Sequence, residues 1–250
     1  MAAGVDQTMR SSKAAFPRPP AFLAGAPPAV LGKLDPDRAL LSALNARKEP
    51  ASLGCRIALG SIDSTLAAAK VQQRRMARAK KMIWKQPTVG RRSRTLFHDV
   101  HFYLICWARV AKLARFVARV TRFPQAQIVL RRYRTRLDQM SGFRDHLEHF
   151  EERLPGGSKQ HVLKVPGDLF NMTGDSATIG GDSVDVGAAS LRLLVVIVKE
   201  FKAAVLFDAL ETLASDDPTT VTRLIRRAAQ DVGLARTIRQ VQKEFGNRGR

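Results

Sequence analysis

The clearest pattern in the chain begins at Leu96, where apolar residues recur in steps of three and four. This spacing places side chains on one face of an α-helix. The predicted stripe consists of Phe97, Val100, Leu104, Trp107, Ala111, Ala114 and Ala118. We expect this first helix to end at Phe123-Pro124, because proline disfavours helical geometry in the residue before it.

Two further helices are predicted before residue 155. The second runs from about Gln125 to Gln139 and is interrupted at Ser141-Gly142. The third begins at Phe143 and stops at Pro155-Gly156-Gly157, where glycine and proline favour a turn. Its apolar positions follow steps of four, three and four, at Phe143, Leu147, Phe150 and Leu154.

The stretch from 161 to 187 changes to short β-favouring pieces separated by Gly-Asp and Gly-Gly pairs. Such pieces and turn residues predict a β-hairpin or a small meander. The pieces are His161 to Val165, Leu169 to Met172, Ala177 to Ile179, and Val184 to Val186.

A helical pattern returns from Ala188 to Leu213 and is the most hydrophobic in the chain, so we expect it at the centre of the core. Asp217-Pro218 predicts the N-cap and first turn of a last helix that reaches about Phe245. The predicted fold class is all-α. A bundle of about four core helices spans 96–214 with a β-hairpin inserted at 161–187, and an amphipathic helix and tail occupy 215–250.

Residues 1–95 have a different character. They carry 18 basic and 5 acidic side chains, several prolines, and apolar residues that are mostly alanine. Short helices are predicted around 38–47 and 63–81, but no wide apolar stripe accompanies them. We therefore expect a basic, Pro/Ala-rich and disordered extension, which can be removed by starting the chain at Met82.

The charge balance predicts an anionic partner. Lys and Arg number 42 against 22 Asp and Glu, a formal net charge of +20. Such a balance favours nucleic acid, RNA before DNA, ahead of an anionic membrane, because cations release counterions when they meet phosphates. Between Val100 and Leu137 there are nine basic residues and no acidic one. The residues expected to bind RNA are Arg109, Lys112, Arg115, Arg119, Arg131, Arg132, Arg134 and Arg136.

The sequence contains no motif for a zinc site, a membrane span, a bound cofactor or a nucleophilic enzyme. The two cysteines, Cys55 and Cys106, have no zinc-like or CxxC spacing, which fits a reducing, cytoplasmic setting. No run reaches the ~18 apolar residues that span a bilayer, so no membrane partner is expected. Cofactor motifs are also missing: we find no nucleotide-binding glycine loop, nucleophile elbow or paired catalytic carboxylates. The i,i+3 histidine pairs His98/His101 and His146/His149 are weak metal-ligand candidates, and no metal site is predicted from them.

One short motif suggests catalysis. Arg144, Asp145 and His149 lie within Phe143–Arg153, and this pattern resembles the R-x4-H motif of the HEPN superfamily. That family consists of helical bundles, among them metal-independent ribonucleases of toxin and defence systems. The resemblance implies that two protomers bring their motifs into one cleft.

The implied roles follow from side-chain chemistry. An imidazole titrates near neutral pH, so His149 would take the 2′-hydroxyl proton. The guanidinium of Arg144 would bind phosphate oxygens, and Asp145 would orient the ring of His149.

A structural reading of the same residues stands beside this one. Arg144 with Glu148, and Asp145 with His149, are i,i+4 pairs of the kind found on solvated helix faces. Two functions therefore remain open. One is a HEPN-like RNA-binding protein that cleaves RNA without a metal as a homodimer. The alternative is a non-enzymatic basic helical protein that binds nucleic acid or a protein partner.

Overall fold

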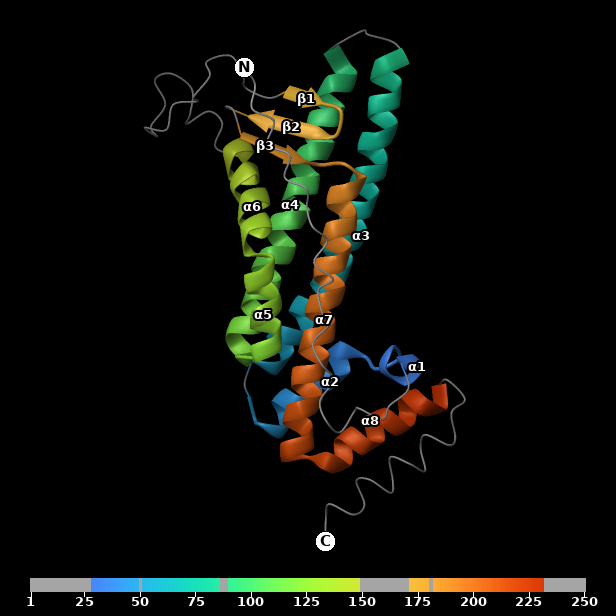
Figure 1. Cartoon of the computed structure of the whole chain (residues 1–250), viewed down its shortest axis with the longest axis vertical. Helices are drawn as coiled ribbons and strands as arrows, with labels where there is room; N and C mark the ends of the chain where they lie inside the picture. Colours follow the sequence, from blue (N-terminus) through green and yellow to red (C-terminus); the bar gives the residue numbers. More distant parts are fainter. Residues whose placement is uncertain (1–27, 50, 86–89, 149–170, 180–181, 232–250) are drawn as a thin grey trace, which may run out of the picture.

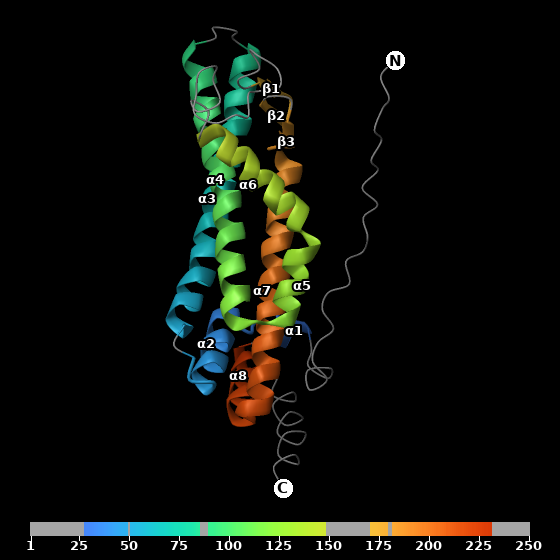
Figure 2. The same cartoon turned by 90° about the vertical axis from the view of Figure 1, so that its left-hand side faces the viewer.

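The computed structural model describes residues 28–49, 51–85, 90–148, 171–179 and 182–231. Within these ranges, long helices form an elongated bundle with one small antiparallel sheet near its upper end (Figures 1 and 2). This confirms the all-α bundle with an inserted β-hairpin. The helices are α1 (Pro28–Leu31), α2 (Pro36–Ala46), α3 (Ser52–Lys85), α4 (Gly90–Thr121), α5 (Pro124–Arg132), α6 (Arg134–Glu148), α7 (Ala188–Asp216) and α8 (Pro218–Asp231).

The most hydrophobic helix, α7, is the centre of the core, as predicted. It packs against α2, α3, α4, α5 and α8, so its buried side chains face several directions rather than one. Phe201 on α7 and Tyr103 and Trp107 on α4 are fully buried. The hydroxyl of Tyr103 reaches Ser190 at 3.0 Å, which satisfies a buried polar group between the two helices.

The expected disordered extension over 1–95 is wrong for residues 28–85. There α2 and α3 form two helices that belong to the core, and α3 lies antiparallel along α4 (Figure 2). The buried stripe of α3 combines small and large apolar residues: Cys55, Ala58, Leu59, Ile62, Leu66, Ala69 and Met76. The small residues let neighbouring helices approach closely, so the large side chains between them are enclosed. Residues 1–27 lie outside the described part of the chain.

Ion pairs join α3 to its neighbours. The Nε atom of Arg75 lies 2.9 Å from a carboxylate oxygen of Asp99, which is almost fully buried on α4. Lys80 pairs with Asp175 of the sheet at 2.7 Å. These contacts show that the basic segment expected to be a free arm is packed against the bundle. The helix predicted to begin at Leu96 also starts earlier, at Gly90.

The helices after Pro124 are divided differently from the prediction. The break falls at Tyr133, between α5 and α6, and α6 continues through Ser141-Gly142. A glycine inside a helix costs only about 1 kcal/mol. Burial of Met140, Phe143 and Leu147 on one face of α6 offsets that cost. The predicted end of the third helix at Pro155 lies outside the described residues.

The predicted meander is a three-stranded antiparallel sheet between α6 and α7. Its strands are β1 (Asn171–Thr173), β2 (Ser176–Ile179) and β3 (Asp182–Asp185), and Thr173 pairs with Ser176 across the first turn. Gly174 has a φ of +59°, which favours glycine. At Gly187 an added Cβ would lie 2.2 Å from Asp175, so only glycine fits. The predicted strand at 161–165 lies outside the described residues.

The last helix confirms the predicted cap. Asp217 accepts a hydrogen bond from the backbone N–H of Thr220 at 3.1 Å, and Pro218 opens α8. Its apolar face, which includes Val221 and Ile225, is buried. The helix is described only as far as Asp231, so the predicted extension to Phe245 lies outside the described residues.

Candidate nucleic-acid interface

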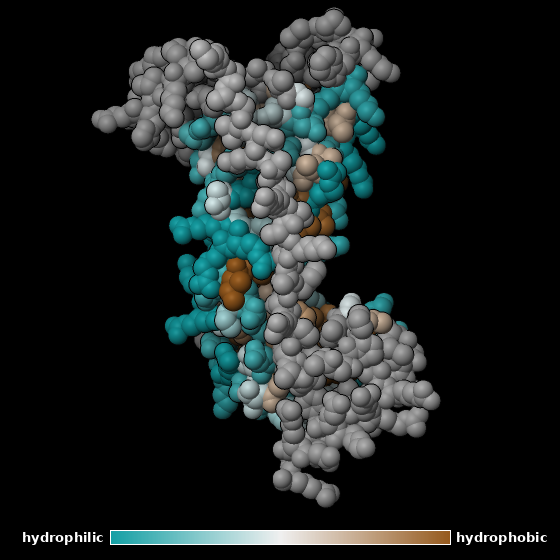
Figure 3. Space-filling view, viewed as in Figure 1, coloured by the Kyte–Doolittle hydropathy of each residue, from teal (hydrophilic) through white to brown (hydrophobic). Residues whose placement is uncertain are grey.

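The eight cations predicted to bind RNA lie on three neighbouring helices. α4 ends at Thr121, Arg122 adopts a left-handed φ of +55°, and Pro124 begins α5, which runs back beside α4 (Figure 2). The chain then continues into α6, which packs against the upper half of α4. On the side of the molecule where α5 and α6 lie, most of the visible side chains are hydrophilic, with a small hydrophobic group among them (Figure 3).

Four of the eight cations are exposed and unengaged by described residues. Arg109, Lys112 and Arg119 project from α4, and Arg131 projects from the end of α5. No ion pair within the described ranges involves any of them. These side chains can meet an anion without first breaking an ion pair within the protein.

Two more cations share one carboxylate. Arg115 of α4 and Arg134 of α6 both pair with Asp138, the latter at 3.4 Å. With Arg131 and Leu130, these residues line an open pocket of about 320 Å³. Three guanidinium groups face a single carboxylate there, so the pocket keeps an excess of positive charge.

The remaining two cations are held by the protein itself. Arg132 donates to Glu200 of α7 at 3.0 Å, and that carboxylate is buried. Arg136 donates to the backbone oxygen of Asp185 at 3.1 Å and lies 5.8 Å from the ring centroid of Trp107. Burial lowers the pKa of the Arg136 guanidinium. Both side chains tie α5 and α6 to the core and the sheet, which gives them a structural role.

A buried carboxylate that the sequence analysis missed holds the start of α5. Asp208 of α7 accepts backbone hydrogen bonds from Ala126 at 3.1 Å and Gln125 at 3.4 Å. Burial is the largest influence and raises the pKa of Asp208 to about 6, while the two backbone N–H donors act in the opposite direction. Phe123 at the N-cap position makes no side-chain cap, so Asp208 supplies one from another helix.

The Arg144 motif is arranged as a chain of ion pairs. Arg144 pairs with Asp145 at 2.7 Å and with Glu148 at 2.5 Å, and Glu148 lies 3.7 Å from Nε2 of His101 on α4. The i,i+4 pair between Arg144 and Glu148 is thus present. Asp145, expected to orient His149, contacts Arg144, and His149 itself lies outside the described residues.

The histidines form no metal cluster in the described ranges. His146 lies 3.8 Å from a carboxylate oxygen of Asp182, and His101 faces Glu148. No group of three or more His, Cys, Asp or Glu residues that could hold a metal ion occurs among the described residues. Within the same ranges, none of the helices is long and apolar enough to cross a membrane.

The structure adds exposed cations that sequence reasoning had placed on a free arm. Lys70, Arg74, Arg78 and Lys81 project from the upper half of α3. The signal that could have placed them is the alternation of four- and three-residue steps from Cys55 through Leu59, Ile62 and Leu66 to Ala69.

Comparison with known proteins adds no assignment. No protein-family model matches the chain, and no curated protein or solved structure is significantly similar to it.

Proposed function

We propose that this protein binds RNA through the exposed cations of α4 and α5. The observation that carries the proposal is the set of four exposed side chains, Arg109, Lys112, Arg119 and Arg131, on adjacent helices and without ion pairs in the described ranges. The pocket of Arg115, Arg131 and Arg134 lies beside them. DNA carries the same phosphates, so we expect only a weak preference for RNA over DNA.

The expected mode of binding is contact with phosphates rather than with bases. Guanidinium and ammonium groups on rigid helices position a backbone but carry no sequence information. On α4, ten residues separate Arg109 from Arg119, about 15 Å along a helix. The cations can therefore meet several phosphates of one strand, and we expect weak sequence preference with strong salt dependence.

The first test compares two double variants that remove the same charge. Arg109→Ala with Lys112→Ala removes two exposed cations from the interface, and Arg223→Ala with Arg227→Ala removes two exposed cations from α8, which is not part of it. RNA affinity is measured by fluorescence anisotropy across a salt series. Each phosphate that is no longer neutralised should reduce the slope of log K against log salt by about 0.7 to 0.9.

We expect the interface variant to show a flatter slope and the α8 variant to behave like the wild type. Affinity that does not change with salt would remove the basis of the proposal. Equal losses in both variants would show that net charge, and not this surface, attracts the RNA.

Cleavage of RNA by Arg144, Asp145 and His149 is the second candidate. The nearness of His101 to Glu148 favours it, because a second imidazole then lies at the Arg144 helix. Against it, Asp145 and Glu148 already engage the Arg144 guanidinium, and a substrate phosphate would have to displace them. The geometry therefore supports binding better than catalysis.

Incubation of the purified protein with mixed RNAs in chelator tests this second candidate. The HEPN-like mechanism requires cyclic phosphate ends and loss of cleavage in both Arg144→Ala and His149→Ala, with RNA binding nearly unchanged in His149→Ala. Sedimentation of the active species should show a homodimer. Cleavage that survives both substitutions would exclude this mechanism but leave RNA binding untouched.

A further inference from the structure

The outer face of the α3–α4 hairpin exposes apolar side chains. Six large hydrophobic residues in the described ranges are strongly exposed, and four of them belong to these two helices. They are Leu53, Ile57, Val71 and Phe102, each with half or more of its surface exposed. Exposed apolar residues are ordinary when single, but a gathering of them indicates an interaction site.

Six outward positions of α3 form one continuous stripe. Leu53, Ile57, Gly60, Ser64, Ala67 and Val71 follow steps of four, three, four, three and four, and none of them is buried. This is the spacing by which one helix packs along another. The stripe has apolar residues at its two ends and small residues between them.

The facing helix adds one aromatic ring at each end of the stripe. Arg75 contacts Asp99, and a Cβ built on Gly54 would lie 3.5 Å from the ring of Phe116. In an antiparallel pair this register places Phe102 level with Val71 and Phe116 level with Leu53. Two apolar patches result. Ile57 and Val71, which mark them, are fourteen residues apart, about 21 Å along a helix.

Within the part of the chain that the structure describes, nothing packs against the glycine in the middle of this stripe. A Cβ added at Gly60 would meet no atom within 4 Å. Glycine in the interior of a helix is destabilising relative to alanine, and nothing packed against Gly60 explains its presence. A second helix that crosses at this point would use the small residue, because a side chain there would hold the two backbones apart.

The charge of the face determines what fits it. Asp63 and Asp99 are the only carboxylates on α3 and α4, and they are engaged by Lys202 and Arg75. Asp63 is half exposed but held by Lys202, and the other exposed charges of α3 are positive, among them Arg56, Arg74 and Arg78. A second copy of this face would bring cations against cations, and an RNA backbone would leave the apolar patches in water.

We propose that the outer face of the α3–α4 hairpin docks an acidic amphipathic helix of a partner protein. Its apolar residues would fill the two patches and its carboxylates would meet the flanking arginines, the helix-in-groove mode of recognition. The proposal is independent of RNA binding, since it uses the stripe and the arginines of α3 and not the exposed cations of α4 and α5.

The probe is a fluorescent peptide of about 22 residues, long enough to span both patches. It carries leucine in steps of three and four with glutamate and alanine elsewhere, and a control peptide carries lysine in place of glutamate. Binding to the full chain is followed by anisotropy. We expect the glutamate peptide to bind and the lysine peptide to bind at least tenfold more weakly.

Two glycine variants localise the binding without risk to the fold. Gly60→Gln and Gly142→Gln both place a side chain into open space within a helix, and Gln favours helix more than Gly does. Both variants should melt at or above the wild-type temperature. Gly60→Gln should weaken peptide binding at least tenfold, and Gly142→Gln on α6 should leave it unchanged.

Several outcomes would overturn the proposal. One is no peptide binding; another is equal binding in both glycine variants. Self-association of the full chain that disappears in Gly60→Gln would show that a second copy occupies the face. Binding of the full chain to vesicles of phosphatidylserine and phosphatidylcholine that disappears in Gly60→Gln would show that a lipid surface occupies the face. The RNA affinity of Gly60→Gln and Gly142→Gln is measured as well. A failure of RNA binding can then be told apart from a failure of peptide docking.

Discussion

At the scale of single residues, Asp208 combines a structural contact with a pH-sensitive group. Its two hydrogen bonds to Gln125 and Ala126 hold α5 in place, yet burial raises its pKa to about 6 from 3.8. The folded chain therefore retains this proton up to a higher pH than the unfolded chain. Between about pH 4 and 6 the folded state binds more protons, so the free energy of unfolding falls as pH rises.

This predicts a pH dependence that one substitution removes. The contribution of Asp208 to the free energy of unfolding should fall by on the order of 3 kcal/mol between about pH 4 and pH 7. Urea unfolding from pH 4.5 to 7.5 measures it in the wild type and in Asp208→Asn. The difference between the two proteins isolates Asp208, because every other titrating group, including Asp37 with its raised pKa, is common to both. Parallel pH profiles would contradict the assignment.

The arginines show how local chemistry divides one residue type into two roles. Arg132 and Arg136 use their donors on Glu200 and on the carbonyl of Asp185, whereas Arg109 and Arg119 extend into solvent. The difference lies in the neighbours, since guanidinium groups are chemically identical. An arginine beside a buried acceptor stabilises the fold, because removing it would leave the acceptor without a hydrogen bond.

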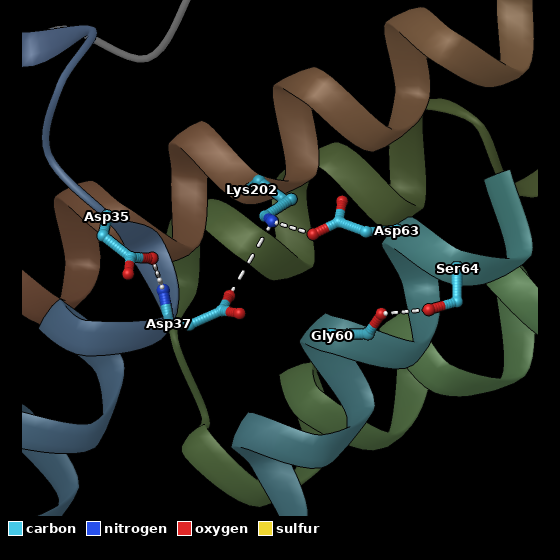
Figure 4. A network of polar contacts seen from close by, with 6 residues as sticks. All are labelled: Asp35, Asp37, Gly60, Asp63, Ser64 and Lys202. Carbon is cyan, nitrogen blue, oxygen red and sulfur yellow. Dashed lines mark hydrogen bonds and ion pairs between the residues drawn. The ribbon is translucent and has the colours of Figure 1, made fainter. Parts of the chain in front are cut away.

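At the scale of elements, Lys202 joins three helices. Its ammonium lies 2.6 Å from Asp63 of α3 and 3.7 Å from Asp37 of α2, next to the Asp35 side chain that caps α2 (Figure 4). Burial raises the pKa of Asp37, and the Lys202 cation acts against that rise. This contact fixes the first helices of the chain to α7.

Replacing Lys202 by Met should therefore weaken the junction. Because Asp63 is half exposed, we expect the free energy of unfolding to fall by only about 1 kcal/mol. The pKa of Asp37 should rise further, which carbon-detected NMR of the carboxyl group can follow. Lys199→Met, an exposed lysine of the same helix, is the matched control. An unchanged Asp37 pKa would show that Lys202 has no electrostatic effect there.

At the scale of the whole molecule, the helices α2 to α8 and the sheet share one core. α2 and α3 bury side chains against α4 and α7, and the sheet is tied to α3 through Lys80. A chain that starts at Met82 lacks α2 and nearly all of α3. The apolar surfaces that these helices cover on α4 and α7 would then face water.

We predict that the chain starting at Met82 is insoluble or loses its cooperative melting transition.

Two isoleucines of α3 test with single substitutions whether this helix belongs to the core. Ile62 is fully buried and Ile57 is largely exposed. Ile62→Ala should cost about 2 to 5 kcal/mol in urea unfolding, and Ile57→Ala should change stability by no more than about 0.5 kcal/mol. Equal, small effects would mean that α3 contributes little to the core.

The sequence by itself determined the elements that carry large apolar residues or strong turn signals. The stripe from Phe97 to Ala118, the apolar run of α7, the Gly-Asp turns of the sheet and the Asp217-Pro218 cap all follow from local preference and periodicity. These features can be recognised in the sequence without knowledge of the neighbouring helices, because each one restricts the backbone or requires burial by itself.

Only the tertiary structure decided which weakly apolar stripes are buried and which basic residues are held by the protein. The apolar stripe of α3 is buried because α4 and α7 lie opposite it, and burial depends on neighbours as much as on a residue's own hydrophobicity. The same holds for the basic residues. The acceptors that engage Arg132 and Arg136 come from 68 and 49 residues along the chain. Contacts between such distant positions follow from packing of the whole chain, so local pattern could not separate structural arginines from exposed ones.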